Sequence, residues 1–383
     1  MKITILANDF GPPWAEGGKN NARHIARTLR RSHEVLVMGL GEHTEEVEVD
    51  GMRVFRIRSP AYRHRLARVA YPMGALALLR KGGAILERER PDLLFSYFET
   101  ASSALVSQVL RDRYSPASKL VHTVWADWTS VHAIPVAHWI SEGLPQLLLN
   151  GQRIGRLGLG GVNKVLASSR YLVDRIETLG LSATFTPTGV DTIHFRPKPE
   201  RRLGNGRLRI GYIGHLTYTK GVSLLLDAIG PILDLEPHLE LVLAVTVNSE
   251  ESSQVRALNH PRITLMGLVD VAETLASFDL TVVPRRFSYG TVSYPNVVLE
   301  SMACGTPVLT SRLPAIDEII TDGVDGFLFR PNNGFDLKAK LLALIRDPTQ
   351  LQAAGAPARA RAEAMDWKIA LDPLTHEIER FAR

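Results

Sequence analysis

Two segments of this 383-residue chain combine residue types that suit an anion. In the first, the pair Gly17–Gly18 stands directly before a helix-like stretch, where small residues let an anion approach the N–H groups of a helix start. In the second, Gly211–Val222, a polar loop between a strand and a helix holds two potential cations, His215 and Lys220. A lysine beside a glycine at a helix start supplies the positive charge that a pyrophosphate needs. A tight turn and a solvated loop lysine are the alternatives.

A third segment, Tyr294–Val308, has the features of a ribose site. Pro295 opens a helix-like run, so the N–H groups of the first turn would face a ligand. Glu300 follows four residues after Asn296 on the same helix face, and its carboxylate can accept hydrogen bonds from a ribose diol. A surface glutamate is the alternative, but the apolar neighbours of Glu300 predict that it is not freely solvated.

These segments lie in the turns of an alternation of strands and helices. The strand candidates before residue 200 are Lys2–Ala7, Glu34–Leu40, Met52–Ile57, Asp92–Tyr97, Lys119–Val124 and Lys164–Ser168. Those after residue 200 are Leu208–Leu216, Leu239–Val247, Ile263–Gly267, Leu280–Pro284 and Pro307–Ser311. Helix-like stretches such as Ser102–Arg113, Val222–Leu233 and Asn296–Ala303 separate them. The pattern predicts the α/β class with parallel sheets.

The segment Phe195–Gly206 interrupts this alternation, because it is charged, rich in proline and glycine, and without apolar periodicity. It predicts a linker between two doubly wound, Rossmann-like domains, residues 1–197 and residues 206–360. Ligands of open parallel sheets bind outside the carboxyl ends of the strands, so two such domains facing one another would hold a ligand in the cleft between them. The alanine-rich stretch Ala353–Ala364 is interpreted as helix surface.

Composition narrows the class of protein. Residues are 45% apolar and 22% charged, no long uncharged apolar run occurs, and the first residues already form a strand pattern, which argues against a spanning segment or a signal peptide. The single cysteine, Cys304, can form neither an intrachain disulfide nor a thiolate zinc site and is expected to be a small buried residue. These features predict a cytoplasmic protein.

The formal charge of +5 is uneven along the chain. Residues 1–200 carry 26 basic and 19 acidic side chains, a net +7, whereas the remaining residues carry 19 and 21, a net −2. An anionic ligand, nucleic acid or an acidic membrane would each fit such an excess. Nucleic-acid binding is disfavoured, because only Arg53–Arg68 combines clustered basic residues with aromatic ones, and no recognised module accompanies it.

Taken together, in this order and at these separations, the segments resemble the retaining glycosyltransferases of family 4, which have the GT-B fold. The resemblance runs over nearly the whole chain and is most specific from Pro295 to Val308. Other matching segments are Ser32–Val35, Ala167–Leu172, Thr188–Asp191, Phe195–Pro197 and Asp322–Gly326. The resemblance implies a nucleotide-sugar donor in the second domain, a glycan, lipid-linked or small-molecule acceptor in the first, and transfer with retention. It also implies that residues 361–383 return to the first domain.

The resemblance assigns roles to residues of this chain. Gly17 and Gly18 match a loop near the donor phosphates, Lys220 the pyrophosphate-binding lysine, and Glu300 the carboxylate on the ribose. The other matches are Asn296 and Val297 for a phosphate or sugar contact, and Gly267 and Leu268 for the nucleobase region. No Asp-x-Asp motif and no His-Glu-x-x-His spacing are present, so we expect neither a metal ion nor another cofactor.

Two departures from the family pattern affect the donor site. His215 stands where the family usually has an arginine, and Val292 stands where a paired glutamate usually contacts the donor sugar. The turn from Pro284 to Pro295 is longer than usual and adds Arg285 and Arg286. These arginines could replace the missing charge or recognise an acidic sugar or acceptor. A solvated basic loop is the alternative.

A third departure concerns catalysis. The family usually has a histidine after the strand Lys119–Val124, but here His122 lies on the strand and the expected position falls near Trp125. His122, Asp127 and His132 are therefore the catalytic candidates. A strand histidine is also typical of a satisfied core group, while Asp127, between two tryptophans, could orient an acceptor hydroxyl.

These departures leave two hypotheses for function: an active glycosyltransferase with an altered sugar subsite, and a GT-B protein that binds a nucleotide or glycan without catalysis. The basic residues Arg63, Arg65 and Arg68 could rest on anionic lipid headgroups, which would give peripheral membrane contact. An ordinary solvated helix is the alternative for this stretch.

Overall fold

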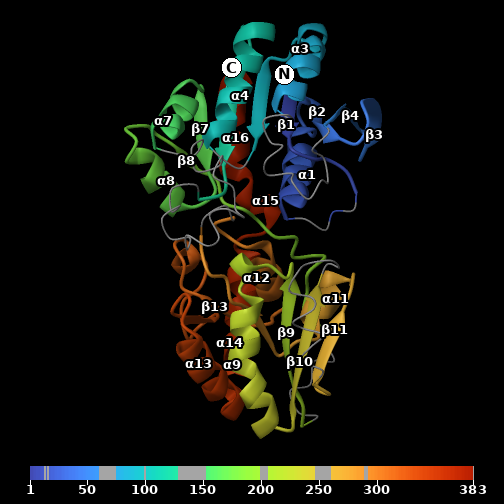
Figure 1. The fold of residues 1–383 in the computed structure, drawn as a ribbon. Coiled ribbons are helices and arrows are strands. Elements are labelled where there is room, and N and C mark those ends of the chain that lie inside the picture. The colour runs from blue at the N-terminus through green and yellow to red at the C-terminus, as the bar shows by residue number, and fades with distance from the viewer. Residues whose placement is uncertain are drawn as a thin grey trace. The chain divides into compact units, whose positions relative to one another are not determined.

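The computed structural model describes residues 1–12, 14, 17–59, 75–98, 101–127, 152–198, 206–245, 260–288 and 292–382 (Figure 1). The chain forms two compact units, and each is described by itself. The N-terminal unit comprises Met1–Thr188, Tyr289–Ser293 and Ala370–Arg383, and the C-terminal unit comprises Gly189–Ser288 and Tyr294–Ile369. Each unit has a sheet of mainly parallel strands, which confirms the predicted α/β class. The domain boundaries predicted at residues 197, 206 and 361 stay predictions.

The sheet of the N-terminal unit has the order β3-β4-β2-β1-β5-β6-β7-β8. Its strands are β1 (Lys2–Ala7), β2 (Glu34–Gly41), β3 (Glu45–Val49), β4 (Met52–Arg58), β5 (Leu93–Tyr97), β6 (Lys119–Val124), β7 (Lys164–Ala167) and β8 (Thr184–Phe185). Only β3 pairs antiparallel with its neighbour. The sequence does not predict β3, because its three glutamates give no apolar run. Such charge is tolerated at the edge of a sheet.

Helices flank this sheet: α1 (Gly17–Leu29), the π-helix η1 (Leu78–Gly82), α3 (Gly83–Glu89), α4 (Ala101–Tyr114), α7 (Gln152–Gly160), α8 (Arg170–Glu177) and α16 (Asp372–Ala382). The central strands contribute the core, in which Leu6, Leu36 and Leu94 are at most 2% exposed. Helix α16 belongs to the same unit, and its Glu377 forms an ion pair with Lys164 of β7 at 3.1 Å. The last helix of the chain is thus part of the N-terminal unit.

The C-terminal unit has the strand order β11-β10-β9-β12-β13-β14. Its strands are β9 (Leu208–Gly214), β10 (Leu239–Val245), β11 (Ile263–Met266), β12 (Leu280–Val283), β13 (Val308–Ser311) and β14 (Phe327–Phe329). The helices are η3 (Tyr218–Lys220), α9 (Val222–Leu235), α11 (Val271–Ala276), α12 (Asn296–Ala303), η4 (Ile316–Glu318), α13 (Gly334–Arg346), α14 (Thr349–Glu363) and α15 (Trp367–Ala370). All the pairings among these strands are parallel. Helix α13 packs on α9, and α14 packs on α12 (Figure 1).

The interpretation of the alanine-rich stretch as helix surface is right for one face of α14, where Ala353, Ala356, Ala360 and Ala364 are exposed, and wrong for the other. Ala354, Ala358 and Ala362 of α14 are at most 2% exposed and recur every fourth residue, so they form one buried stripe. Small side chains allow close packing at this helix, since a Cβ atom on Gly355 would lie 2.9 Å from the carbonyl oxygen of Gly305. The buried alanines of α14 therefore allow the helix to pack closely, because close approach needs small side chains.

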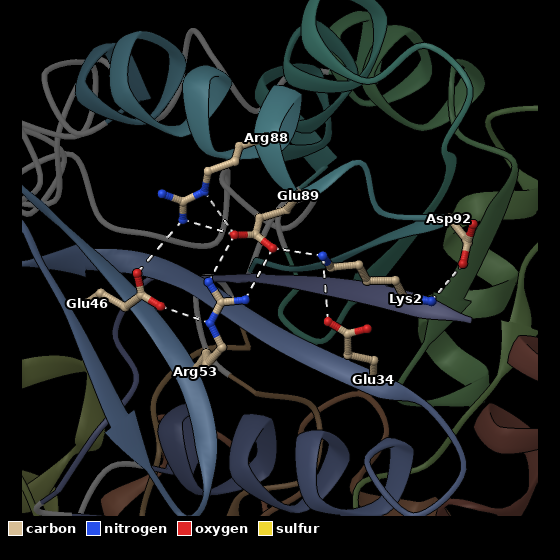
Figure 2. A network of polar contacts seen from close by, with 7 residues as sticks. All are labelled: Lys2, Glu34, Glu46, Arg53, Arg88, Glu89 and Asp92. Carbon is tan, nitrogen blue, oxygen red and sulfur yellow. Dashed lines mark hydrogen bonds and ion pairs between the residues drawn. The ribbon is translucent and has the colours of Figure 1, made fainter.

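A network of charged side chains ties β1, β4 and α3 together (Figure 2). Its centre is Glu89, 8% exposed, whose carboxylate accepts hydrogen bonds from Lys2 Nζ at 2.8 Å, Arg53 Nη2 at 3.0 Å and Arg88 Nε at 3.0 Å. Burial alone would raise the pKa of Glu89, but the hydrogen bonds from the three cations outweigh it and lower the pKa to about 2. The ionised carboxylate therefore favours the folded state.

Replacing Glu89 by glutamine is expected to lower the free energy of unfolding at pH 7 by about 2 kcal/mol, because Lys2, Arg53 and Arg88 lose the buried carboxylate that they share. In the wild-type protein this contribution is present above pH 4.5, the ordinary pKa of the carboxyl group, and is lost as the pH falls toward about 2. Urea denaturation at several pH values measures both effects. The exposed Glu87→Gln is the matched control, and an equal loss in both variants would contradict the assignment.

Candidate functional site

The turns that follow β9 and β12 carry the four predicted cations of the donor site, His215, Lys220, Arg285 and Arg286. The two strands are parallel neighbours, with Gly211 opposite Thr281, so their carboxyl ends lie at the same edge of the sheet. Ligands of open parallel sheets bind outside this edge. The two turns therefore form the candidate site.

Gly221 brings these two turns into direct contact. Its φ of +72° lies in the left-handed region, and a Cβ atom on it would lie 1.8 Å from the carbonyl oxygen of Pro284. Beside this contact, the backbone N–H of Arg286 donates to the carbonyl of Thr219 at 3.0 Å. Only glycine fits both the conformation and the space, so the adjoining Lys220 and Arg285 are held in neighbouring positions.

Lys220 and Arg285 place two positive charges in a poorly solvated environment. Burial, and then the charge of Arg285, lower the pKa of Lys220 to about 8. Arg285 is 3% exposed, and burial lowers the pKa of its guanidinium to about 10. The burial of Lys220 and the charge of Arg285 both act against the charged form of Lys220. A bound anion would reverse them, because its charge favours protonated lysine and offsets the repulsion between the two cations.

Arg286, which was predicted to act with Arg285, has a different environment. Its guanidinium donates to Asn332 Oδ1 and Ser223 Oγ, each at 3.2 Å, and lies over the ring of Tyr218 at 4.4 Å. These contacts join η3, the start of α9 and the turn after β14. Arg286 thus connects three parts of the C-terminal unit through its side chain. Its contact with a donor stays a prediction.

His215 follows Gly214, at the end of β9, and its side chain is exposed. The hydroxyl of Tyr212 donates to the His215 carbonyl at 2.7 Å, which fixes the backbone of the turn. The imidazole therefore lies outside the buried environment that Lys220 and Arg285 share. A phosphate contact by His215 stays a prediction.

Helix α12, the element that follows β12, carries N–H groups at its start and the carboxylate of Glu300. Pro295 caps the helix without a side-chain hydrogen bond, and its carbonyl accepts from the N–H of Val298 at 2.9 Å. Asn296 and Val297 form the first turn, where a helix has no acceptor of its own for its N–H groups. Glu300, one turn later, is half-buried, and burial raises the pKa of its carboxyl group to about 7.

The predicted nucleobase region, Gly267 and Leu268, follows the edge strand β11. Leu268 is 80% exposed and Met266 is 38% exposed, so an apolar surface is available for a flat ring. The nucleobase role of Gly267 and Leu268 stays a prediction.

In the N-terminal unit, Gly17 and Gly18 begin α1 as predicted. A Cβ atom on Gly18 would lie 3.4 Å from the indole of Trp125, so the helix start rests against this ring. The cation of the same turn, Lys19, is already paired with Asp9 at 2.7 Å. The predicted proximity of the glycine pair to donor phosphates is not tested by these contacts.

The catalytic candidates lie on and after β6. His122 is 0% exposed, and its Nδ1 lies 2.8 Å from Ser96 Oγ, which in turn lies 2.8 Å from Ser107 Oγ. This burial favours the core alternative that the sequence left open. Asp127 is 1% exposed and accepts a hydrogen bond from the hydroxyl of Tyr171 at 3.0 Å. Both catalytic roles stay predictions.

Val292, at the position of the missing glutamate, pairs with Ala126 in an isolated antiparallel bridge within the N-terminal unit. The next residue, Ser293, donates its N–H to the carbonyl of Trp125 at 3.1 Å. The long turn after β12 thus ends in a short strand-like pairing beyond β6. The sequence predicted its extra length but not this partner.

Two family models match the chain. One, described as "Glycosyl transferase 4-like domain", matches residues 16–187, and the other, "Glycosyl transferases group 1", matches residues 207–347. The chain belongs to the family 4-like glycosyltransferases with the GT-B fold. The resemblance found in the sequence is confirmed.

Solved structures agree with this fold. Sucrose-phosphate synthase from Thermosynechococcus elongatus has a TM-score of 0.84 to this chain at 18% identity, covering 100% of this chain and 99% of that chain. Alr3699/HepE from Anabaena, solved in complex with UDP-glucose, has a TM-score of 0.72 at 17% identity, covering 99% and 100%.

Among characterised relatives, phosphatidyl-myo-inositol mannosyltransferase from Mycobacterium leprae is 30% identical over 216 residues, covering 54% of this chain and 56% of the relative. The chain spans about half the length of the curated relatives it matches first, 56%, 56% and 48%.

Some of the residues predicted to be functional lie outside the described ranges, namely His132, Arg63, Arg65 and Arg68. In the described part of the chain, no group of three histidine, cysteine or acidic side chains could hold a metal ion. No helix within the described ranges is both long enough and apolar enough to cross a membrane.

Proposed function

We propose that this glycosyltransferase moves a hexosyl group from a nucleoside-diphosphate sugar to an acceptor hydroxyl, with retention at the anomeric carbon and without a metal ion. The observation that carries the proposal is the pair of neighbouring, poorly solvated cations, Lys220 and Arg285, at the carboxyl edge of the C-terminal sheet. Two poorly solvated cations side by side repel one another, and an anion bound beside them would offset that repulsion. A diphosphate offers the charge and size that two cations can hold.

The same charges would act in the reaction. Cleavage of the bond between sugar and diphosphate leaves negative charge on the leaving group, and fixed cations aimed at that charge lower the barrier. Lys220 and Arg285 would supply the positive charge that a metal ion supplies in other phosphate sites. Glu300 would hold the ribose through its diol. Retention is supported by the family to which the chain belongs.

Candidates for the donor and acceptor come from the similar proteins. HepE was solved with UDP-glucose, which makes this compound the first donor to test. The acceptor would be a glycan, a lipid-linked molecule or a small molecule bound by the N-terminal unit. A phosphatidylinositol-like acceptor would suit the net +7 of residues 1–200. Peripheral membrane contact and a cytoplasmic location belong to the same proposal.

A panel of nucleotide sugars tests the proposal. Calorimetry measures binding, and release of nucleoside diphosphate measures turnover with acceptor candidates and with a chelator present; NMR of the product gives the anomeric configuration. Glu300→Gln is expected to weaken binding of a nucleoside diphosphate by about 10- to 100-fold, because a hydrogen-bonded carboxylate is lost. The exposed Glu273→Gln is the matched control.

The second candidate is a GT-B protein that binds a nucleotide or glycan without catalysis. It is favoured by Val292, which pairs with Ala126 and offers no acceptor to a sugar hydroxyl. Binding without turnover of any donor would support it, whereas a protein that binds no nucleotide would contradict both candidates.

A further inference from the structure

Trp125 stands at the carboxyl end of β6, beside two other parts of the N-terminal unit. Its ring stacks on Tyr97, with the centroids 5.8 Å apart and the planes at 19°. Gly18, at the start of α1, lies near the benzo end of the indole, where a Cβ atom on it would be 3.4 Å from Cη2 and 3.6 Å from Cζ2 of Trp125. The ring is partly exposed, so one portion of it faces the region where a ligand of this sheet would bind.

Ser293 lies directly across from Trp125 in the short antiparallel pairing. The bridge joins Ala126 to Val292, so Trp125 and Ser293 are the neighbouring opposite pair, and their side chains share one face. The carbonyl of Trp125 also accepts from Ser168 Oγ at 3.5 Å. Two polar side chains are thus held together on a fixed backbone.

Neither of these polar groups is satisfied by the protein. In the described part of the chain, the indole N–H of Trp125 and the hydroxyl of Ser293 are buried without a hydrogen-bond partner. Buried polar groups are nearly always paired, and leaving two on one face opposes folding. A phenylalanine and an alanine would fill the same space without this cost. The two groups therefore indicate a ligand that completes them.

We propose that Trp125 and Ser293 hold a hydroxyl oxygen of a bound sugar, with the indole N–H donating and the serine hydroxyl donating or accepting. The inference rests on the proposed function, and it names residues that position the sugar, not the nucleotide. A hydroxyl fits because it accepts from the indole while it still has a proton for the serine oxygen. An aromatic ring beside such a contact suits the apolar face of a sugar.

Access to the two polar groups depends on the position of the indole ring. The start of α1 lies at the benzo end of this ring, and a Cβ atom on Gly18 would make ordinary van der Waals contact there, so Gly18 does not cover the ring nitrogen. Because the indole nitrogen is buried while Trp125 as a whole is partly exposed, a sugar hydroxyl reaches the N–H only after a small shift of the ring.

The variant Trp125→Phe tests the inference, because it keeps an aromatic ring and removes the N–H. The measured quantity is the ratio of two dissociation constants, one for a nucleoside diphosphate and one for the matching nucleotide sugar. We expect this ratio to fall by about tenfold, with unchanged affinity for the diphosphate. The urea midpoint of the ligand-free protein should stay equal or rise, since an unsatisfied donor is removed. Trp367→Phe, in the C-terminal unit, is the matched control.

Ser293→Ala should change the same ratio in the same direction and tests the second group independently. If the sugar belongs to the acceptor, both variants will instead raise the KM for the acceptor at saturating donor, so the two measurements distinguish the sources. Wild-type binding of a nucleotide sugar, with neither quantity changed in either variant, would overturn the inference alone. A wild-type protein that binds no nucleotide sugar would overturn the proposed function and the inference with it.

Discussion

Replacing Gly221 by alanine is expected to lower the free energy of unfolding by at least about 3 kcal/mol and to abolish nucleotide binding. The left-handed backbone accounts for about 1 kcal/mol of the loss. The remainder comes from the new Cβ atom, which would lie 1.8 Å from the carbonyl oxygen of Pro284. Because that oxygen belongs to the backbone, the turns after β9 and β12 must move apart, and Lys220 and Arg285 would no longer be neighbours.

Gly323→Ala separates the two causes. Gly323 has a φ of +79°, close to the +72° of Gly221, but nothing lies within 4 Å of a Cβ atom placed on it. This control should show the conformational cost alone, about 1 kcal/mol, with unchanged nucleotide affinity. Urea denaturation and calorimetry with a nucleoside diphosphate measure both quantities. Equal losses in the two variants, or intact binding by Gly221→Ala, would show that the contact between the turns does not shape the site.

Much of the fold could be predicted because the chain alternates apolar runs with glycine and proline. β1, β6 and α12 have the predicted ends, Lys2–Ala7, Lys119–Val124 and Asn296–Ala303. The stripe of alanines in α14 was misjudged, because small apolar residues carry little signal for burial. Only the neighbouring α12 shows that they face a helix.

The sequence predicts those site residues whose positions depend only on their own segment of the chain. Lys220 and Glu300 each follow a local signal, a glycine-flanked helix start and a proline-opened helix. The different roles of Arg285 and Arg286 could not be predicted, because they depend on Ser223 and Asn332, which are distant in sequence. The pairing of Trp125 with Ser293 was hidden for the same reason, since it joins residues far apart along the chain.

His122 shows which part of a catalytic role can be predicted from sequence: the residue type, but not its environment. A histidine on a buried strand has the right residue type for proton transfer, and the sequence left its environment open. The serine hydroxyl of Ser96 at 2.8 Å and the complete burial of the ring give it a partner inside the core. Such a contact depends on the register between β5 and β6, in which Ser96 lies opposite His122.

Replacing Lys220 by methionine is expected to stabilise the ligand-free protein while it removes nucleotide binding. Burial and the charge of Arg285 lower the pKa of Lys220 to about 8, so keeping the side chain charged at pH 7 costs up to about 3 kcal/mol. Methionine has a similar length and avoids this cost. Affinity for a nucleoside diphosphate should fall by about 100-fold or more, because a charge-assisted contact with phosphate is lost.

The pH dependence of stability tests the same cost of the charged Lys220 side chain. The cost of Lys220 is fully present below about pH 8 and disappears as the pH rises to 10.5, the ordinary lysine pKa, so the stability difference between wild type and Lys220→Met should close across that interval. Diphosphate affinity of the wild type should decrease above about pH 8, as Lys220 loses its proton. Lys198→Met, at an exposed lysine, should change neither quantity. A ligand-free Lys220→Met protein that is less stable than wild type would mean that Lys220 already has a favourable partner in the fold, and the anion site would lose its main support.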